Sequence, residues 1–581
     1  MRERYRTRQD TSVENYASVE KYASGVYAIR RAERETSNSG GNNISDLVVN
    51  TEILAGERSP ARERSPVETH SLWAAWRWWL PLALLALVLA NVFVDPFAGD
   101  WDALDYTTLA VHGQASSMIL GRTLFIYANH ALWRIAHGLF AVPPENAYLL
   151  FKYAVVAQSP LAVIAWWRLA RDLTNSVRAA TLAALLLALS PFYIIYSGQA
   201  MTEIPSLLLM AVALTLHLKG LRTKRAVWVL AGAALLGLSV NVREAALLYA
   251  PWLLIAPLVY GWQLGWKSER REMAITILAG LVFLACAFGP FALLLWTDIN
   301  NYRWSWHGWV ESSRMESARH PVSLGNMKPL LQFFFVASPL VFLALPFALF
   351  GEWKRRGLFG SPPLAFAALG LVANLSLIVH YSVTINGRYM LTGLPALTPL
   401  VATYLLGSLT TKMQGARLAF VYVLTGVLLA AVVGSIYFWP TNRAYVEGRA
   451  LAKDYVARLA LVPRDAVMIS GGQTVAVTYW RGIGAGEWDV IGTGGGWPGA
   501  QLASVIEKHL EEGRRVFLDA DPHWWSAHGW QELEIRELVE IEPQFRFRRI
   551  SETIYEIRPL ADDTARDQPH LDRLLPPRPK T

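Results

Sequence analysis

Residues 273–296 read MAITILAGLVFLACAFGPFALLLW, a run of 24 residues without one charged side chain. An α-helix needs about 20 apolar residues to cross the ~30 Å hydrocarbon core of a bilayer. This run is therefore long enough to span a membrane. Comparable runs recur through the middle of the chain and give eleven candidate spans: 73–94, 146–167, 179–197, 203–218, 226–241, 245–262, 273–296, 330–350, 362–380, 389–408 and 418–438.

The composition indicates the same class of protein. Of the 581 residues, 53% are hydrophobic and 17% are charged, whereas soluble domains have about 45–50% apolar and about 25% charged residues. Residues 1–70 and 440–581 are ordinary polar sequence, so the middle of the chain is more apolar than the average. We therefore exclude a single soluble domain. The only cysteine, Cys286, lies inside an apolar run and excludes a disulfide framework.

The formal charge of +8 lies mostly in short connections between the spans, which favours membrane topology over nucleic-acid binding. Cytoplasmic loops carry an excess of Lys and Arg. With a cytoplasmic N-terminus, five inner connections hold fifteen such residues: Arg168, Arg171, Arg178, Lys219, Arg222, Lys224, Arg225, Lys267, Arg270, Arg271, Lys354, Arg355, Arg356, Lys412 and Arg417. The three short connections on the other side hold only Arg243 and Arg388. This pattern predicts an inner-membrane protein with its N-terminus inside and its C-terminus outside.

These observations predict a polytopic α-helical membrane protein with a small C-terminal extracytoplasmic α/β domain. Strand-like runs alternate with a helical pattern after residue 465, which is typical of such a domain. We expect four parts: a disordered cytoplasmic tail at 1–70, a transmembrane domain at 71–439 with outer loops 95–145 and 297–329, an α/β domain at 440–560, and an unstructured tail at 561–581.

The stretch 119–141 is also apolar but contains Arg122 and Arg134. We expect it to form a helix that lies in the membrane interface. Counting it as a span would place every later loop on the opposite side and would break the charge pattern.

The first outer loop contains three carboxylates within six residues, Asp100, Asp102 and Asp105, followed by Tyr106. On a helix that starts near Asp102, Asp102 and Tyr106 share a face. Carboxylates at a membrane surface suit a general base or ligands for a hard cation. The alternative is that Asp100 and Asp102 cap a helix N-terminus. Both interpretations stay open at this point.

Three further elements place ionisable residues at the outer surface. Glu203 begins the fourth span, where an acidic residue also complements the helix dipole. Arg243 departs from the charge pattern, so we expect it to pair with Glu244, with the first-loop carboxylates or with an anionic ligand. Arg388, followed by Tyr389, is suited to hold a phosphate with two hydrogen bonds, although a snorkelling interfacial arginine is the alternative.

The second outer loop is rich in aromatic residues. Trp306 and His320 belong to this group, together with Trp304, His307 and Trp309. Aromatic faces on an outer loop suit sugar stacking, whereas an aromatic belt resting on the bilayer is the alternative interpretation.

In their order along the chain, these elements resemble the GT-C superfamily of polytopic glycosyltransferases. The similarity is greatest to the aminoarabinose-type and RgtA/B/C/D-like transferases, and protein O-mannosyltransferases are more distant. Four elements carry it: the acidic first loop; the Ser-x-x-x-x-Thr-Glu-x-Pro element at Gly198 to Pro205, with Ser197 just before it; Gly-x-x-x-x-x-Arg-Glu at Gly237 to Glu244; and the Arg-Tyr element from Arg388 to Pro395.

The resemblance implies roles for individual residues. The family's first-loop pattern, Asp-Glu-x-x-Tyr, makes Asp102 the catalytic base, while Asp100 or Asp105 would replace the missing Glu. Arg388, Tyr389 and Arg243 would bind the donor phosphate. Substrate contacts would come from Tyr106, Glu203, Glu244, Trp306 and His320. No cofactor is established, but a divalent cation would have Asp100, Asp102 and Glu203 as its ligands.

The expected function is that of an inverting glycosyltransferase. The donor would be a polyprenyl-phosphate sugar, and the acceptor a glycan, lipid or protein of the cell envelope. The alternatives are a transporter or flippase of lipid-linked sugars, or a non-catalytic envelope scaffold. The spans carry few charges and show no internal repeat, which argues against a transporter.

Overall fold

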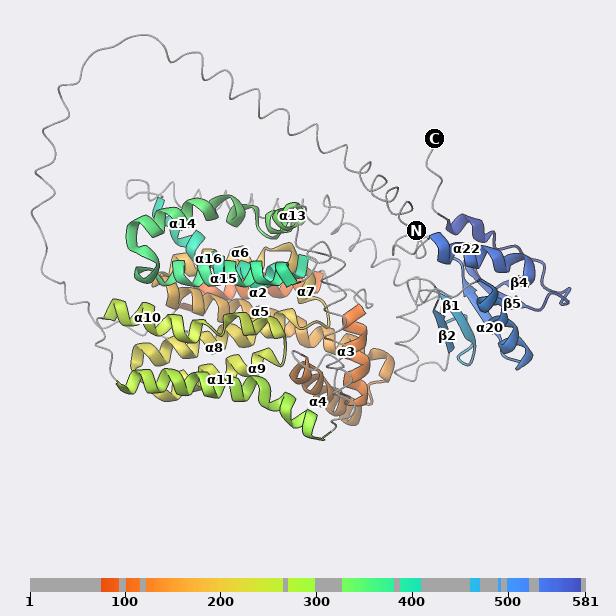
Figure 1. Ribbon diagram of the computed structural model, residues 1–581, viewed down its shortest axis with the longest axis horizontal. Coiled ribbons are helices and arrows are strands. Elements are labelled where there is room, and N and C mark those ends of the chain that lie inside the picture. Colours follow the sequence, from red (N-terminus) through yellow and green to blue (C-terminus); the bar gives the residue numbers. More distant parts are fainter. Residues whose placement is uncertain are drawn as a thin grey trace, which may run out of the picture. The chain divides into compact units, whose positions relative to one another are not determined.

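The computed structural model describes ten ranges of the chain: 75–92, 101–114, 122–264, 270–297, 327–380, 387–408, 460–470, 489–492, 499–521 and 532–575 (Figure 1). The expected tail at 1–70 and the candidate span 418–438 lie outside these residues.

The described residues up to 408 are helical. The α-helices are α2 (Trp76–Val92), α3 (Trp101–His112), α4 (Thr123–Phe140), α5 (Ala147–Thr174), α6 (Val177–Ala188), α7 (Pro191–Ser197), α8 (Glu203–Thr223), α9 (Ala226–Val240), α10 (Trp252–Leu264), α11 (Arg270–Thr297), α13 (Met327–Ala337), α14 (Pro339–Gly360), α15 (Pro362–His380) and α16 (Met390–Ser408). Short 3-10 helices connect some of them: η3 (Pro144–Asn146), η4 (Glu244–Tyr249) and η7 (Gly387–Tyr389).

Several of these helices have the length and composition of membrane spans. Among the described residues five qualify, or up to seven if each of two bent pairs counts as one span. The pairs are α6 with α7, bent by 67°, and α13 with α14, bent by 103°. Shorter apolar helices occupy Trp76–Val92, Ala226–Val240 and Pro362–Leu375. Every candidate span from 73–94 to 389–408 thus falls on an apolar helix or a bent pair, while the count of eleven stays a prediction.

Local sequence explains where the helices begin and end. α5 stops at Asn175, which adopts the left-handed conformation (φ 52°) that asparagine tolerates well. The next residue, Ser176, caps α6 by accepting a hydrogen bond from the Ala179 amide. The break between α6 and α7 falls at Ser190, and Pro191 then opens α7 at a position where a missing N–H costs nothing.

Glycines allow α9 to pack closely between α8 and α11, which lie beside it (Figure 1). A Cβ at Gly232 would lie 2.6 Å from the His217 backbone nitrogen of α8, and a Cβ at Gly237 would lie 2.5 Å from the Phe283 carbonyl oxygen of α11. Only glycine permits backbones to approach so closely. The end of α9 is further held by Asn241, whose Nδ2 donates to the Cys286 carbonyl at 3.0 Å. This packing fixes the turn that carries Arg243.

The C-terminal described residues form a five-stranded sheet in the order β2-β1-β3-β5-β4. The strands are β1 (Val467–Ser470), β2 (Asp489–Gly492), β3 (Val516–Asp519), β4 (Arg546–Arg549) and β5 (Ile554–Arg558), with helices α20 (Gly499–Glu511) and α22 (Glu532–Ile541) and short 3-10 helices η8 (Glu542–Gln544) and η9 (Leu571–Leu574). β1 runs parallel to β2 and β3, whereas β5 is antiparallel to β3 and β4. The expected strand at Val475–Tyr479 lies outside the described residues.

The segment 561–575 was expected to be unstructured, and the structure corrects this. Leu571 and Leu574 of η9 are buried in the hydrophobic core of the sheet and its helices. Asp567 forms an isolated bridge with Phe547 of β4. Two well-placed leucines anchor the segment although its composition is polar, and composition alone does not reveal such anchors. Residues 576–581 lie outside the described part.

Candidate functional site

Four charged side chains from distant parts of the sequence meet at helix starts. Asp102 lies in the first turn of α3 and Glu203 is the first residue of α8. Arg243 precedes η4, and Arg388 lies in η7. Arg388 Nη1 lies 2.7 Å from Asp102 Oδ2, and Arg243 Nη1 lies 2.8 Å from Glu203 Oε1. Arg388 Nε is 3.8 Å from the same Glu203 oxygen. We call these four residues the arginine–carboxylate cluster.

The members of this cluster differ in exposure. The side chain of Asp102 is 30% exposed, that of Arg388 is 15%, and those of Arg243 and Glu203 are 8% and 2%. A charge as buried as Glu203 persists only when cations and hydrogen bonds compensate it. The two arginines supply that compensation. Asp102 is therefore the carboxylate of the cluster that is more accessible to solvent.

Tyr389 orders the two arginines. The guanidinium carbon of Arg388 lies 5.4 Å from the centre of the Tyr389 ring, and that of Arg243 lies 5.8 Å from it. A cation within ~6 Å of an aromatic ring is attracted by the ring's electron-rich face. One aromatic ring thus contacts both arginines that the sequence singled out for phosphate binding.

The partner of Arg243 differs from the expected ones. The sequence suggested Glu244, the first-loop carboxylates or an anionic ligand, but in the structure Arg243 forms an ion pair with Glu203. The reason is geometric: Arg243 has an extended backbone (φ −155°), so its side chain and that of the next residue, Glu244, point in different directions. The negative charge of Glu244 instead raises the pKa of Arg122, against the lowering effect of burial.

Arg122 joins the site without having been predicted there. It immediately precedes α4 and is buried, and its Nε donates a hydrogen bond to the Tyr106 hydroxyl. Burial opposes the charge of Arg122, but Glu244, Tyr106 and Asp102 outweigh it and raise its pKa. Burial likewise raises the pKa of Tyr106 far above its usual range, so the phenol stays protonated. Its position inside the apolar stretch 119–141 was the available signal. The sequence analysis used that signal only to place the stretch in the membrane interface.

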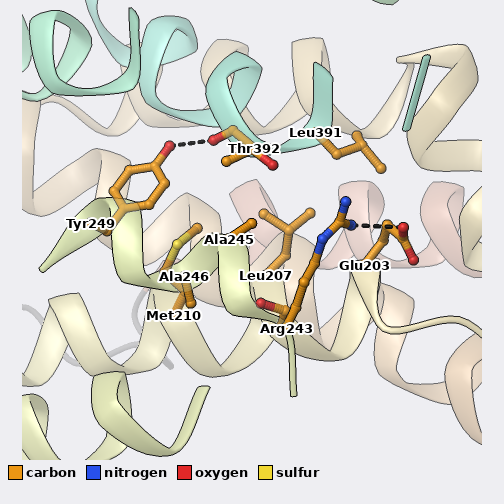
Figure 2. Close-up of a pocket in the computed structure, with 10 residues that line it drawn as sticks. Glu203, Leu207, Met210, Arg243, Ala245, Ala246, Tyr249, Leu391 and Thr392 are labelled. Carbon is orange, nitrogen blue, oxygen red and sulfur yellow. Dashed lines mark hydrogen bonds and ion pairs between the residues drawn. The ribbon is translucent and has the colours of Figure 1, made fainter. Parts of the chain in front are cut away.

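A cavity with about 270 Å³ of empty space, part of which is open solvent, adjoins the cluster. Figure 2 shows Glu203 and Arg243 at one end of it and Tyr249, which donates to the Thr392 carbonyl, at the other. Most of the remaining lining is apolar: Leu207, Met210, Ala245, Ala246 and Leu391. The second oxygen of Glu203 is buried and has no hydrogen-bond partner among the described residues. The cavity therefore combines an apolar wall with a charged end.

Some predicted site residues cannot be placed. Asp100, Trp306 and His320 lie outside the described residues, as does the side chain of Asp105. Of the expected metal ligands, Asp102 and Glu203 both contact Arg388, so the two carboxylates already share a guanidinium. Within the part of the chain that the structure describes, no group of three or more His, Cys, Asp or Glu side chains is placed to hold a metal ion. The two described carboxylates therefore pair with an arginine in this structure, and the metal site that would include Asp100 stays a prediction.

Several solved structures are similar to this chain. ArnT from Cupriavidus metallidurans, bound to undecaprenyl phosphate, is 14% identical with a TM-score of 0.49, covering 85% of this chain and 100% of its own. The oligosaccharyltransferase AglB from Archaeoglobus fulgidus is 13% identical with a TM-score of 0.47, covering 86% and 77%. The arabinofuranosyltransferase AftD from Mycobacteria is 14% identical with a TM-score of 0.44, covering 84% and 40%. At such values these similarities establish neither the fold nor the activity of this chain.

Comparison of the sequence with known proteins and with family models gives a match to one family model. No curated protein is significantly similar in sequence to the chain. Residues 130–292, which include Glu203, Arg243 and Glu244, match the model of the family described as dolichyl-phosphate-mannose-protein mannosyltransferase. This match confirms the resemblance of the chain to the GT-C glycosyltransferases.

Proposed function

We propose that the protein is an inverting glycosyltransferase that moves a sugar from a polyprenyl-phosphate donor to a glycan, lipid or protein acceptor of the cell envelope. One observation carries the proposal: Asp102, the accessible carboxylate of the cluster, lies 2.7 Å from Arg388. A base and a phosphate-binding cation thus stand side by side. The family matched by residues 130–292 is named for a polyprenyl-phosphate-type donor, which supports the same class of substrate.

In this proposal Asp102 is the general base. It takes the proton of the acceptor hydroxyl while that oxygen attacks the anomeric carbon of the sugar. The bond between the anomeric carbon and the phosphate oxygen breaks on the opposite side, which inverts the configuration. The exposure of Asp102 (30%) supports this role, because an acceptor must reach the base. Glu203, at 2% exposed, is suited to position arginines rather than to exchange protons with an acceptor. Asp100 or Asp105 remains our proposal for a second carboxylate.

Arg388 and Arg243 are the proposed phosphate ligands. The leaving lipid phosphate gains negative charge as the sugar departs, and fixed guanidinium groups stabilise that charge without reorganisation. Both arginines are held by Glu203 and Tyr389 before any ligand arrives. When donor binds, we expect the phosphate to compete with Asp102 for Arg388, which would release the carboxylate for catalysis.

The apolar cavity is the proposed place for the first prenyl unit of the donor. Its wall of Leu207, Met210 and Leu391 suits hydrocarbon, and its charged end at Arg243 suits the attached phosphate. The proposal also includes the predicted orientation, with the N-terminus in the cytoplasm and the C-terminal sheet outside. In a Cys286→Ala background, cysteines at 310 and 530 should react with an impermeant thiol reagent in spheroplasts, and one at 355 should not.

A deletion strain tests the function itself. Mass spectrometry of envelope glycans, lipids and proteins should show the loss of one sugar, together with accumulation of a polyprenyl-phosphate sugar. The wild-type gene should restore the sugar, and Asp102→Asn should not, although the variant is made at normal level. Full restoration by Asp102→Asn would instead support a flippase or a scaffold, since neither requires a base.

A further inference from the structure

A second cavity lies at the other end of α8. It is a surface hollow with about 360 Å³ of empty space, part of which is open solvent, between the turn from α8 to α9 and the start of α11. These segments lie at the same end of the bundle (Figure 1). α8 has 21 residues, and a helix rises 1.5 Å per residue, so this cavity is about 30 Å from Glu203. It therefore takes no direct part in the chemistry proposed above.

The charge of this cavity is mainly positive. Lys224, Arg225 and Arg271 line it, and Glu272 is the carboxylate among the lining residues. All three cations are exposed to solvent. Cations that only determine membrane orientation need to lie on one side of the bilayer, but they do not need to converge. Here residues from the end of α8, the start of α9 and the start of α11 face one hollow.

Part of the wall of the cavity and the neighbouring helix surface are apolar. Val229 and Ile275 line it beside the three cations. Close to it along the chain, large apolar side chains of α9 and α11 are exposed: Val227 at 66%, Leu278 at 45% and Leu281 at 58%. A soluble anion would use only the charged part of such a site. A ligand with a phosphate and an attached hydrocarbon chain would use both parts.

We propose that this cavity binds the phosphate headgroup of an anionic phospholipid, with an acyl chain lying along the exposed face of α11. The three cations complement the negative headgroup, as basic pockets between transmembrane helices do. The proposal is independent of the glycosyltransferase function, because it involves neither Asp102 nor Arg388.

Native mass spectrometry of the purified full-length protein tests this site. The probe is phosphatidylglycerol, and phosphatidylcholine serves as the zwitterionic comparison. The test variant is Arg225→Gln with Arg271→Gln. The matched control is Arg178→Gln with Lys354→Gln, which removes two exposed cations from other predicted inner connections. We expect one phosphatidylglycerol to bind at least ~10-fold more weakly to the test variant, whereas the control binds like the wild type.

The other outcomes overturn the proposal. Equal loss in both variants would show general attraction of anionic lipid to a basic surface. Equal binding of phosphatidylcholine would remove the role of charge, and displacement of the lipid by millimolar inorganic phosphate would identify a soluble anion as the ligand.

A further variant guards against misfolding. Lys224 has a left-handed backbone (φ 53°), which asparagine also accepts. Lys224→Asn should therefore fold normally, as judged by thermal unfolding in phosphatidylcholine, and still bind phosphatidylglycerol several-fold more weakly. Unchanged binding by a folded Lys224→Asn variant would contradict the site.

Discussion

Two regions of the molecule surround a buried glutamate with arginines, and they do so differently. In the helical region Glu203 contacts Arg243 and Arg388, whose side chains are 8% and 15% exposed. In the C-terminal sheet the fully buried Glu556 contacts Arg515, Arg548 and Arg558, at 2.6, 2.5 and 2.9 Å, and these side chains are 45%, 46% and 33% exposed. Both clusters consist of a glutamate and arginines, but the arginines are largely buried in the helical region and partly exposed in the sheet.

The difference indicates which cluster is arranged for a ligand. Arginines that water reaches lose little when a partner is removed, because solvent screens them. The sheet arginines lie just before β3, in β4 and in β5, the strand of Glu556 itself, and they neutralise that carboxylate. The arginines near Glu203 come from segments 145 positions apart, at 243 and 388, and adjoin a cavity. Buried guanidinium groups held beside a cavity are better placed for an entering anion than exposed ones, so our proposal gives this cluster a function and the sheet cluster a stabilising role.

The largest expected effect distinguishes a carboxylate of the arginine–carboxylate cluster, Asp102, from the sheet carboxylate Glu556. Asp102→Asn keeps the size of the side chain but removes the base, so sugar transfer should fall by ~10²-fold or more with expression unchanged. Glu556→Gln should leave transfer near the wild-type rate. Initial rates with membranes containing equal amounts of each protein measure this. Near-normal turnover by Asp102→Asn would show that the base is another residue.

The next effect separates the two sets of arginines. Lysine keeps the charge but cannot present two parallel N–H donors to a phosphate. Arg388→Lys should therefore raise the KM for the lipid donor by about 10-fold, since a bidentate charged contact is worth roughly 1.5–3 kcal/mol. Arg548→Lys, at an exposed position, should leave that KM unchanged. A shift in acceptor KM alone would place Arg388 on the acceptor side.

A smaller effect concerns stability. Tyr106→Phe removes the hydroxyl that accepts a hydrogen bond from buried Arg122, and an unsatisfied buried donor costs about 1–3 kcal/mol. We expect a lower midpoint of thermal unfolding in detergent. Tyr127→Phe, at an exposed position on α4, is the control and should leave the midpoint unchanged. An equal midpoint for Tyr106→Phe would mean that Arg122 has other adequate partners.

The smallest effect is the pH dependence of the sheet. Burial alone would raise the pKa of Glu556, but hydrogen bonds and charges from Arg515 and Arg558 outweigh it and lower the pKa below its ordinary value of 4.5. Because the folded-state pKa is the lower one, this stabilisation is complete above the unfolded value and is lost as pH falls through the folded value. Hydrogen exchange of 546–558, corrected for intrinsic rates, should therefore rise below pH 4.5 in the wild type. Glu556→Gln should lack that acid-dependent rise.

The sequence was sufficient for the features that follow from periodicity and charge. Apolar length predicted where the helices α2, α5 to α11 and α13 to α16 run, and the positive-inside pattern made Arg243 and Arg388 exceptional. The structure places both exceptional arginines in one cluster with Asp102 and Glu203. Charges on the unexpected side of a membrane protein therefore carried the most information about the site.

Which side chains pair within the site was not predictable from the sequence, because these contacts depend on how the helices pack. The Glu203 partner of Arg243 lies 40 positions away, and the contact depends on α9 lying against α8 through Gly232. Arg122 reaches Tyr106 only because α3 and α4 fold back on each other. The order of residues 561–575 likewise depends on two leucines reaching a core built by distant strands.

Binding of undecaprenyl phosphate is the measurement that decides whether the buried arginines hold a lipid phosphate, as we propose. Native mass spectrometry would compare the wild type with Arg388→Ala and with Arg548→Ala, and thermal unfolding would confirm that each variant is folded. We expect Arg388→Ala to lose at least ~10-fold in affinity and Arg548→Ala to bind like the wild type. Equal affinity of a folded Arg388→Ala variant would contradict it.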